Sequence, residues 1–263
     1  MKKKDQLNYF RHEWAKLKTD LKTFDKKGKQ EALHHFRVQV KRLRAFLVLA
    51  DSGENGHNLE KQLKPVRKIF KAAGVIRNAY ITHELSKEYQ QEPTAFMRGQ
   101  YRLMKESTAQ FQSASTKHLA RIRNTRRRLK KAIPQFSNVH LSMYYRQQLE
   151  KIALCLQSQR PEASLHDCRK QIKMLIYNYS MVKPVLNLAV NEDYLEQVQT
   201  AIGDWHDKQV AIELFSNEEE GSASVVESIK KELKQLKRKI SGLIKDFYNR
   251  ATTVVDLPLG QID

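Results

Sequence analysis

Hydrophobic residues recur at helical spacing along almost the whole chain. The first segment shows the pattern most clearly, with a single apolar face made of Leu7, Phe10, Trp14, Leu17, Leu21 and Phe24. Residues three or four positions apart share one side of an α-helix, so this face predicts a helix that packs on a core. Lys and Gly interrupt the pattern at residues 26–29, and a second helix is predicted over residues 30–50.

The same spacing predicts helices along the rest of the chain. In the first half we expect a helix that stops at Gly74, a further helix over residues 78–90, and one long helix or two over residues 94–132. In the second half we expect a helix over residues 139–158, a break at Pro161 and a helix that carries His166 and ends at Lys183. A segment over residues 192–202 should lead to Gly203, followed by a short helix that ends at Phe215 and a last helix over residues 223–250. The pattern therefore predicts an all-α fold with an irregular tail.

Two short phrases each occur twice. Residues 33–41 and 165–173 both read L-H-x-x-R-x-Q-[V/I]-K, and residues 74–78 and 203–207 both read G-x-x-[R/H]-[N/D]. The spacing between the two copies is nearly the same for both phrases, which indicates an internal duplication. We predict one domain over residues 1–263, with a first repeat at 5–135, a second at 138–250 and an irregular tail at 251–263.

Charge is the next informative property. The chain has 48 Lys and Arg against 29 Asp and Glu, a formal net charge of +19, and a hydrophobic fraction of 40% that is sufficient for a core. Such an excess of positive charge indicates attraction to a polyanion. The scarcity of Gly and Pro, 9 and 6 residues, agrees with a helical fold.

Two cysteines are too few for a disulfide framework or a zinc cluster. Cys168 stands at an apolar helical position, so we interpret Cys155 and Cys168 as reduced core thiols. The N-terminus lacks the apolar core of a secretory signal, and no apolar run approaches the length of about 20 residues that a membrane span needs. We expect a soluble cytoplasmic protein without membrane partners.

The His-containing phrase forms a basic stripe when it is placed on a helix. His34, Arg37, Lys41 and Arg44 fall within an arc of about 80°. His166, Arg169 and Lys173 repeat the stripe, with Ile176 in the place of Arg44. Closely spaced cations of this kind are suited to neighbouring negative charges, and Arg and Lys are both phosphate-binding side chains. Arg77-Asn78 and His206-Asp207 are interpreted as caps of short helices rather than ligand contacts.

Two further basic stripes occur on the predicted helices, one in each half. They consist of Lys117, Arg121 and Arg128 and of Lys230, Lys234 and Lys237. Their spacing of three to four residues, with longer gaps, would let each face the His helix of its own half. A simply solvated helix face is the alternative for both stripes.

These residues resemble the CHAD family, the conserved-histidine α-helical domain. His34, Arg37, Val38, Lys41, Arg42, Leu43 and Arg44 match its first motif, and His166, Arg169 and Lys173 match its second. Asn78, Met174 and Ile176 depart from the family pattern. The resemblance implies two pseudo-symmetric helical bundles around a basic cleft and binding of inorganic polyphosphate without catalysis. A location on polyphosphate granules and assistance to polyphosphate-metabolising enzymes both agree with it.

The motif residues and the two further basic stripes together give a set of candidate polyphosphate-binding residues, with no cofactor, catalytic residue or metal ligand among them. They are His34, Arg37, Lys41, Arg42, Arg44, His166, Arg169, Lys173, Lys117, Arg121, Arg128, Lys230, Lys234 and Lys237.

Two other functions are alternatives. His166-Asp167 and His206-Asp207 resemble the pairs that hold divalent metals in phosphohydrolases, although the first half repeats no carboxylate at these places. Nonspecific nucleic-acid binding would also suit the charge, but the stripes lack the interleaved aromatic residues on which bases stack.

Overall fold

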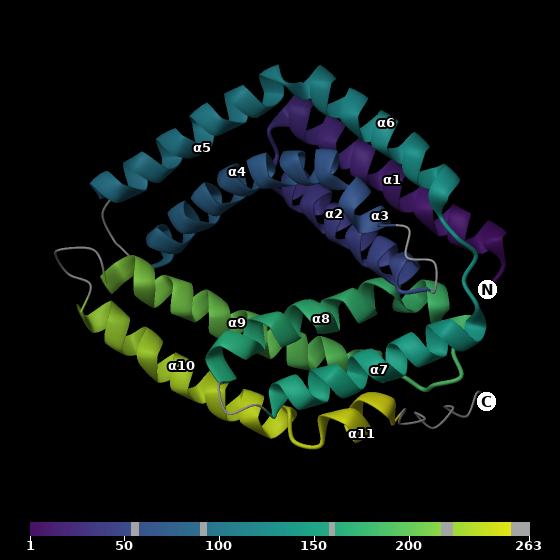
Figure 1. Ribbon diagram of the computed structural model, residues 1–263. Helices are drawn as coiled ribbons and strands as arrows, with labels where there is room; N and C mark the ends of the chain where they lie inside the picture. Colours follow the sequence, from purple (N-terminus) through teal and green to yellow (C-terminus); the bar gives the residue numbers. More distant parts are fainter. Residues whose placement is uncertain (54–57, 90–93, 158–160, 217–222, 254–263) are drawn as a thin grey trace, which may run out of the picture. The chain divides into compact units, whose positions relative to one another are not determined.

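Helices make up nearly all of the computed structural model (Figure 1), which describes residues 1–53, 58–89, 94–157, 161–216 and 223–253. No strand occurs within these residues, so the predicted all-α fold is confirmed. The chain divides into two compact units, Met1–Phe136 and Ser137–Asp263. None of the described helices combines the length and the apolar character that a membrane-spanning segment needs.

The first unit is a bundle in which consecutive long helices pack on one another. Its helices are α1 (Lys3–Lys27), α2 (Gln30–Asp51), α3 (Leu59–Gln62), α4 (Lys64–Tyr89), α5 (Ala95–Ser113) and α6 (Ser115–Ala132). α1 packs on α2, α2 on α4 and α4 on α5, while α6 lies against α1, α3 and α4. α2 and α4 thus form the centre of the unit.

The start of this unit follows directly from the sequence pattern. The predicted apolar face of α1 is buried, with Phe10 and Leu17 fully covered and Trp14 at 1% exposure. Gly28 ends the helix in the left-handed region, at φ 62°, and its N–H donates to the Phe24 carbonyl at 2.8 Å. Glycine adopts this conformation at little cost, which explains the break between α1 and α2.

The second unit repeats this order of packing. Its helices are α7 (Asn138–Leu156), α8 (Pro161–Val182), the short 3-10 helix η1 (Lys183–Val185), α9 (Glu192–Ser216), α10 (Ala223–Leu243) and α11 (Phe247–Thr252). α7 packs on α8, α8 on α9 and α9 on α10. α8 and α9, which carry the second copy of each repeated phrase, therefore occupy the places that α2 and α4 occupy in the first unit.

Two helix boundaries predicted at glycine are wrong. α4 continues from Lys64 to Tyr89 through Gly74, and α9 continues from Glu192 to Ser216 through Gly203. Both glycines are buried in the middle of a helix and neither has a positive φ. A packing contact, rather than a turn, is the reason for glycine at these positions.

Other boundaries differ in smaller ways. The segment predicted as one long helix or two is two helices that meet at Ala114, and the last predicted helix is divided where Asp246 adopts φ 50°. The breaks predicted at residues 54–56, 92–93 and 217–221 and the part of the tail after Thr253 lie outside the described residues.

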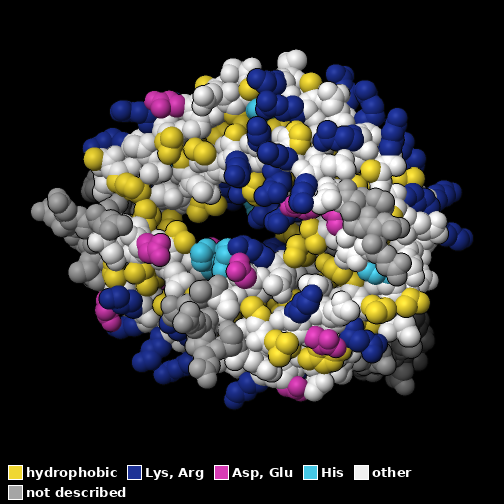
Figure 2. All heavy atoms as spheres, in the orientation of Figure 1, with side chains coloured by type: hydrophobic (Ala, Val, Ile, Leu, Met, Phe, Trp, Pro, Cys, Tyr) yellow, Lys and Arg dark blue, Asp and Glu magenta, His cyan; other side chains and the backbone are white. Residues whose placement is uncertain are grey.

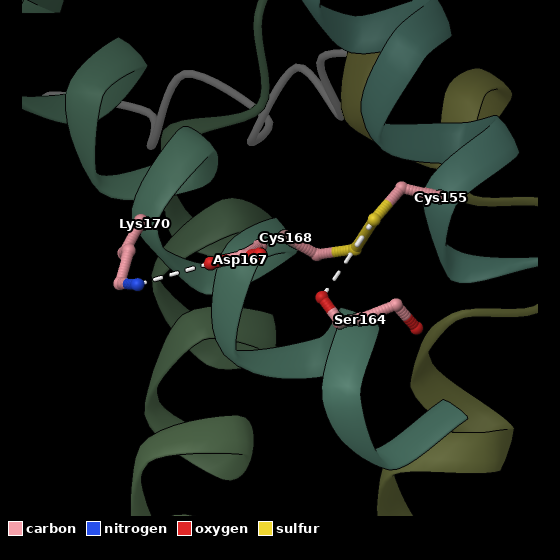
Figure 3. The surroundings of a disulfide bond; sticks show 5 residues. All are labelled: Cys155, Ser164, Asp167, Cys168 and Lys170. Carbon is pink, nitrogen blue, oxygen red and sulfur yellow. Dashed lines mark hydrogen bonds and ion pairs between the residues drawn. A yellow bond between two sulfur atoms is a disulfide. The ribbon is translucent and has the colours of Figure 1, made fainter. Parts of the chain in front are cut away.

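The interpretation of the two cysteines as reduced thiols is also wrong. Cys155 of α7 and Cys168 of α8 form a disulfide bond, with their Cα atoms 6.4 Å apart (Figure 3). Cys168 is fully buried, as its apolar position predicts. The sequence pattern could place Cys168 in the core, but the partner depends on how α7 crosses α8.

Candidate anion-binding site

The predicted basic stripe lies on α2, and α4 completes it. His34 and Lys41 are exposed, whereas Arg37 is half-buried against α4. Arg77 of α4 is close enough for its charge to lower the pKa of both His34 and Arg37. We call His34, Arg37, Lys41 and Arg77 the His34 cluster. It was incompletely predicted, because Arg77 had been interpreted as a helix cap and instead lies within α4.

Arg37 is fixed by contacts with the backbone of α4. Its Nη1 donates a hydrogen bond to the Phe70 carbonyl at 2.8 Å, and its guanidinium lies 4.2 Å from the centre of the Phe70 ring. A Cβ atom on Gly74 would stand 2.6 Å from the same Nη1. Gly74 therefore makes room for the guanidinium, and the two repeated phrases are one structural unit in which Arg packs on Gly.

The His34 cluster concentrates positive charge. Although His34 is exposed, the surrounding protein partly desolvates it and so lowers its pKa, and four neighbours lower the pKa further: Arg77, His35, Lys41 and Arg37. Burial and Arg77 also lower the pKa of Arg37. The Nε atom of Arg77 is buried without a hydrogen-bond partner among the described residues. Cations held together in this way repel one another, and a bound anion would relieve the repulsion.

Two other predicted residues of α2 lie in different surroundings. Arg44 donates from Nε to Glu60 of α3 at 2.9 Å, and Arg67 of α4 shares the same carboxylate oxygen at 3.1 Å. Arg42 is half-buried near Tyr9 of α1, where its charge opposes the rise that burial causes in the pKa of Tyr9. Neither arginine belongs to the cluster around His34.

The second unit repeats the contact between Arg and Gly. Arg169 of α8 donates from Nε to the Gln199 carbonyl of α9 at 3.0 Å, and a Cβ atom on Gly203 would lie 2.7 Å from its Nη2. Gln199 precedes Gly203 by four residues, as Phe70 precedes Gly74. In both units, therefore, the arginine donates to the carbonyl one helical turn before the glycine.

The surroundings of this arginine differ between the units. His206 stands three residues after Gly203, as Arg77 stands after Gly74, and the rings of His166 and His206 lie 4.6 Å apart. Burial lowers the pKa of His166, and Lys170 and His206 are the next causes. The buried Nδ1 of His166 has no hydrogen-bond partner within the described part of the chain. We call His166, Arg169, Lys173 and His206 the His166 cluster.

Acidic and amide groups moderate the charge of the His166 cluster. Lys173 donates from Nζ to Gln199 Oε1 at 3.2 Å, and Gln199 in turn donates to Glu196 at 2.5 Å. Burial and Arg169 lower the pKa of Lys173, whereas Glu196 opposes this shift. Glu196 occupies the place that Arg67 occupies in the first unit, seven residues before the glycine. The His166 cluster is thus the less basic of the two.

The same asymmetry extends to the whole units. The first has 32 Lys and Arg against 12 Asp and Glu, a net charge of +20, and the second has 16 against 17, a net charge of −1. Figure 2 shows Lys and Arg side chains gathered over the part of the first unit where α4 and α6 lie. The net positive charge of the chain therefore comes from the first unit.

The two accessory stripes lie on exposed helix faces. Lys117 is exposed near the start of α6, while Arg121 and Arg128 line a groove with residues of α3 and α4. Lys230, Lys234 and Lys237 are exposed on α10, which packs on α9. The sequence did not predict that Arg121 and Arg128 share this groove with Lys61, Lys64 and Lys68. The helical spacing of these three lysines, at intervals of three and four residues, could have indicated a further basic face.

The His-Asp pairs do not assemble a metal site within the described residues, where no three His, Cys, Asp or Glu side chains gather suitably. The Asp167 carboxylate instead accepts a hydrogen bond from Lys170 at 2.9 Å (Figure 3). This ion pair is the first cause of the lowered pKa of Asp167.

Comparisons with known proteins agree with this architecture. A crystal structure of the CHAD domain from the plant Ricinus communis is similar to this chain, with a TM-score of 0.64 and 15% sequence identity over 96% of this chain and 92% of the other. At this identity the likeness concerns the fold. No curated protein sequence matches significantly. The family model of the CHAD domain matches residues 8–216, which include both copies of the paired His and Gly phrases, and the chain therefore belongs to the CHAD domain family.

Proposed function

We propose that the protein binds inorganic polyphosphate without catalysis, and that the His34 cluster is the principal contact. One observation carries this proposal: every charged neighbour that shifts the pKa of His34 lowers it, so the cluster is an unbalanced concentration of cations. A polymer of phosphoryl groups supplies closely spaced negative charges that neutralise such a cluster. Polyphosphate is also the ligand that the resemblance of the motifs to the CHAD family implies.

The contact between Arg37 and Gly74 supports the proposal because it positions the cluster before a ligand arrives. One Nη atom of Arg37 is held by the Phe70 carbonyl, and the guanidinium lies on the Phe70 ring. A side chain held in this way loses little conformational entropy when it contacts a phosphate. Arg77 and Lys41 then supply further charge from the adjacent turns of α4 and α2.

The first unit is proposed to dominate the interaction. Its net charge of +20 attracts a polyanion at long range, whereas the second unit, with a net charge of −1, does not. Association with polyphosphate granules, or with enzymes that act on the polymer, is compatible with this function.

A titration tests the proposal directly. The full chain is titrated with long-chain polyphosphate and, separately, with orthophosphate at the same total phosphate concentration. We expect strong binding of the polymer alone, with an affinity that falls as salt rises because neutralised phosphates release counterions. Equal and weak responses to the two ligands would contradict the proposal.

Nucleic acid is the competitor that tests specificity. The Phe70 and Tyr80 rings lie against the guanidinium groups of Arg37 and Arg77 and are half-buried, so nucleic acid would contact the cluster mainly through its phosphates. Polyphosphate is therefore expected to displace RNA and DNA from the protein at moderate salt. Displacement of polyphosphate by nucleic acid would favour the nucleic-acid alternative.

A further inference from the structure

A second basic surface of the first unit is hollowed into a groove. Its volume is about 610 Å³, and it lies between α3, the first turns of α4, and α6. Five cationic side chains and no acidic one line it, together with Asn58, Gln62 and Pro65: Lys61, Lys64, Lys68, Arg121 and Arg128. None of the five pairs with a carboxylate among the residues that the structure describes. The groove is therefore a concave site with an uncompensated positive charge.

The walls of the groove are held in place by hydrogen bonds. The Asp51 carboxylate accepts from the N–H groups of Leu59 and Glu60, at 2.7 and 2.8 Å, and so fixes the short helix α3. Arg128 donates from Nη2 to the Gln62 carbonyl at 3.0 Å and ties α6 to α3. Lys61, Lys64 and Arg121 are thus carried by three elements whose mutual positions are set without a ligand.

The groove is separate from the His34 cluster, since the two share no residue. Glu60 marks the boundary between them. It precedes Lys61 in α3, but its carboxylate accepts hydrogen bonds from Arg44 of α2 and Arg67 of α4. Along the axis of α4, Lys68 lies about 9 Å from Gly74. An anion in the groove would therefore contact a different set of cations.

We infer that this groove is a second anion-binding site, which takes a compact run of phosphoryl groups such as tripolyphosphate or the end of a longer polyphosphate chain. Five cations around one groove suit a ligand with several negative charges better than a single orthophosphate. The volume lies within the range of about 300 to 1,000 Å³ that is common for small-ligand sites. No aromatic residue lines the groove, so a nucleoside attached to the phosphates gains no stacking contact.

The inference deepens the proposed function, on which its ligand class rests, by adding Lys61, Lys64 and Lys68 as contacts. Its test uses the full chain and calorimetric titration with tripolyphosphate. The groove variant is K61Q/K64Q/K68Q. The control variant, K18Q/K22Q/K26Q, removes the same charge from exposed lysines of α1. All six side chains are exposed, so unchanged far-UV circular dichroism is expected in both variants.

The groove variant is expected to weaken tripolyphosphate binding by at least about tenfold, whereas loss of the same charge on α1 should change it by less than about twofold, because salt screens distant charges. ATP should bind wild type no more tightly than tripolyphosphate does. Equal losses in the two triple variants would overturn the inference, and so would tighter binding of ATP.

A variant of the His34 cluster separates this inference from the proposed function. K41A/R77A should impair binding of long-chain polyphosphate while tripolyphosphate still binds in the groove. If K41A/R77A impairs long-chain binding but the groove variant leaves tripolyphosphate affinity unchanged, the inference fails and the proposed function stands. If the groove variant alone has an effect, the groove is a site and the His34 cluster is not the principal contact.

Discussion

Arg37 and Gly74 are in such close contact that the glycine cannot be exchanged for alanine without moving the arginine. A Cβ atom at residue 74 would lie 2.6 Å from Nη1 of Arg37, whose other contacts are the carbonyl and the ring of Phe70. Arg169 and Gly203 have the same relationship in the second unit, at 2.7 Å. In each unit, therefore, the arginine can keep its position only if the residue that it contacts on the neighbouring helix is glycine.

The first prediction concerns this contact. Gly74→Ala gains about 1 kcal/mol of helix propensity, but it displaces a guanidinium whose charged hydrogen bond contributes about 1.5 to 3 kcal/mol. We therefore expect the free energy of unfolding to fall by about 1 kcal/mol, as measured by urea denaturation. Gly99→Ala in α5 is the matched control, because nothing lies within 4 Å of its Cβ position. It should stabilise the protein, and stabilisation by both substitutions would contradict the packing role of Gly74.

The second prediction concerns the His34 cluster. K41A/R77A should weaken long-chain polyphosphate binding by about tenfold or more, because each lost phosphate contact removes a charge-assisted hydrogen bond. K2A/K4A removes the same charge from two exposed N-terminal lysines and is the control. Lys3 is left intact because it donates to the Ile133 carbonyl at the end of α6. Equal effects of the two double variants would mean that binding is diffuse.

The third prediction compares the two units. K173A/H206A changes the His166 cluster at the positions that K41A/R77A changes in the His34 cluster. Lys173 is already hydrogen-bonded to Gln199, and Glu196 lies nearby, so its loss should cost less binding than the loss of Lys41. We expect K173A/H206A to reduce polyphosphate affinity by less than about threefold at neutral pH. An effect as large as that of K41A/R77A would show that both clusters contribute equally.

Much of the fold could be predicted because it depends on local patterns. The apolar spacing in α1 and the interruption at residues 26–29 are properties of short segments, and both were predicted correctly. Gly74 was misinterpreted because a glycine that ends a helix and a glycine that accommodates a neighbouring side chain look alike in sequence. The repeated offset between Arg37 and Gly74 was visible, but its meaning depends on how α2 packs on α4.

The candidate site shows the same limit. A helical stripe correctly groups His34, Arg37 and Lys41, since they share one helix. It could not show that Glu60 of α3 neutralises Arg44, or that Lys61 and Lys64 meet Arg121 across a groove. The difference in net charge between the units follows from counting the charged residues of each unit, once the boundary between the units is known. The internal duplication stays a prediction. It is supported by the matching contacts of Arg37 with Gly74 and of Arg169 with Gly203.

The fourth prediction concerns pH. Burial and the neighbouring cations lower the pKa of His34 in the folded protein below its ordinary value of 6.5. The unfolded chain then takes up a proton more readily, so the free energy of unfolding falls as the pH drops through 6.5. Bound polyphosphate raises the pKa of His34 and reverses this trend, so polyphosphate affinity should increase as the pH falls.

Urea denaturation at pH 7.5 and 5.5, with and without polyphosphate, measures both effects. His118 and His166 also have lowered pKa values and contribute to the trend of the free protein. His34→Gln isolates the part due to His34, because glutamine does not titrate. If the affinity of wild type and of His34→Gln changes equally between the two pH values, His34 does not face the polymer.

The last prediction concerns the disulfide between Cys155 and Cys168, which joins α7 to the helix that carries the His166 cluster. The two cysteines are 13 residues apart, and closing a loop of this size stabilises a fold by about 3 kcal/mol in the chain-entropy model. Reduction should therefore lower the stability of the second unit by about 2 to 3 kcal/mol and leave the first unit unchanged.

The chain has 2 tryptophans, one in each unit, and both Trp14 and Trp205 are 1% exposed. Trp14→Phe leaves a fluorescence reporter for the second unit, and Trp205→Phe leaves one for the first. A shift on reduction that is confined to the Trp205 signal, and absent in C155A/C168A, is the expected result. Two titratable thiols in the protein under oxidising conditions would instead support reduced cysteines.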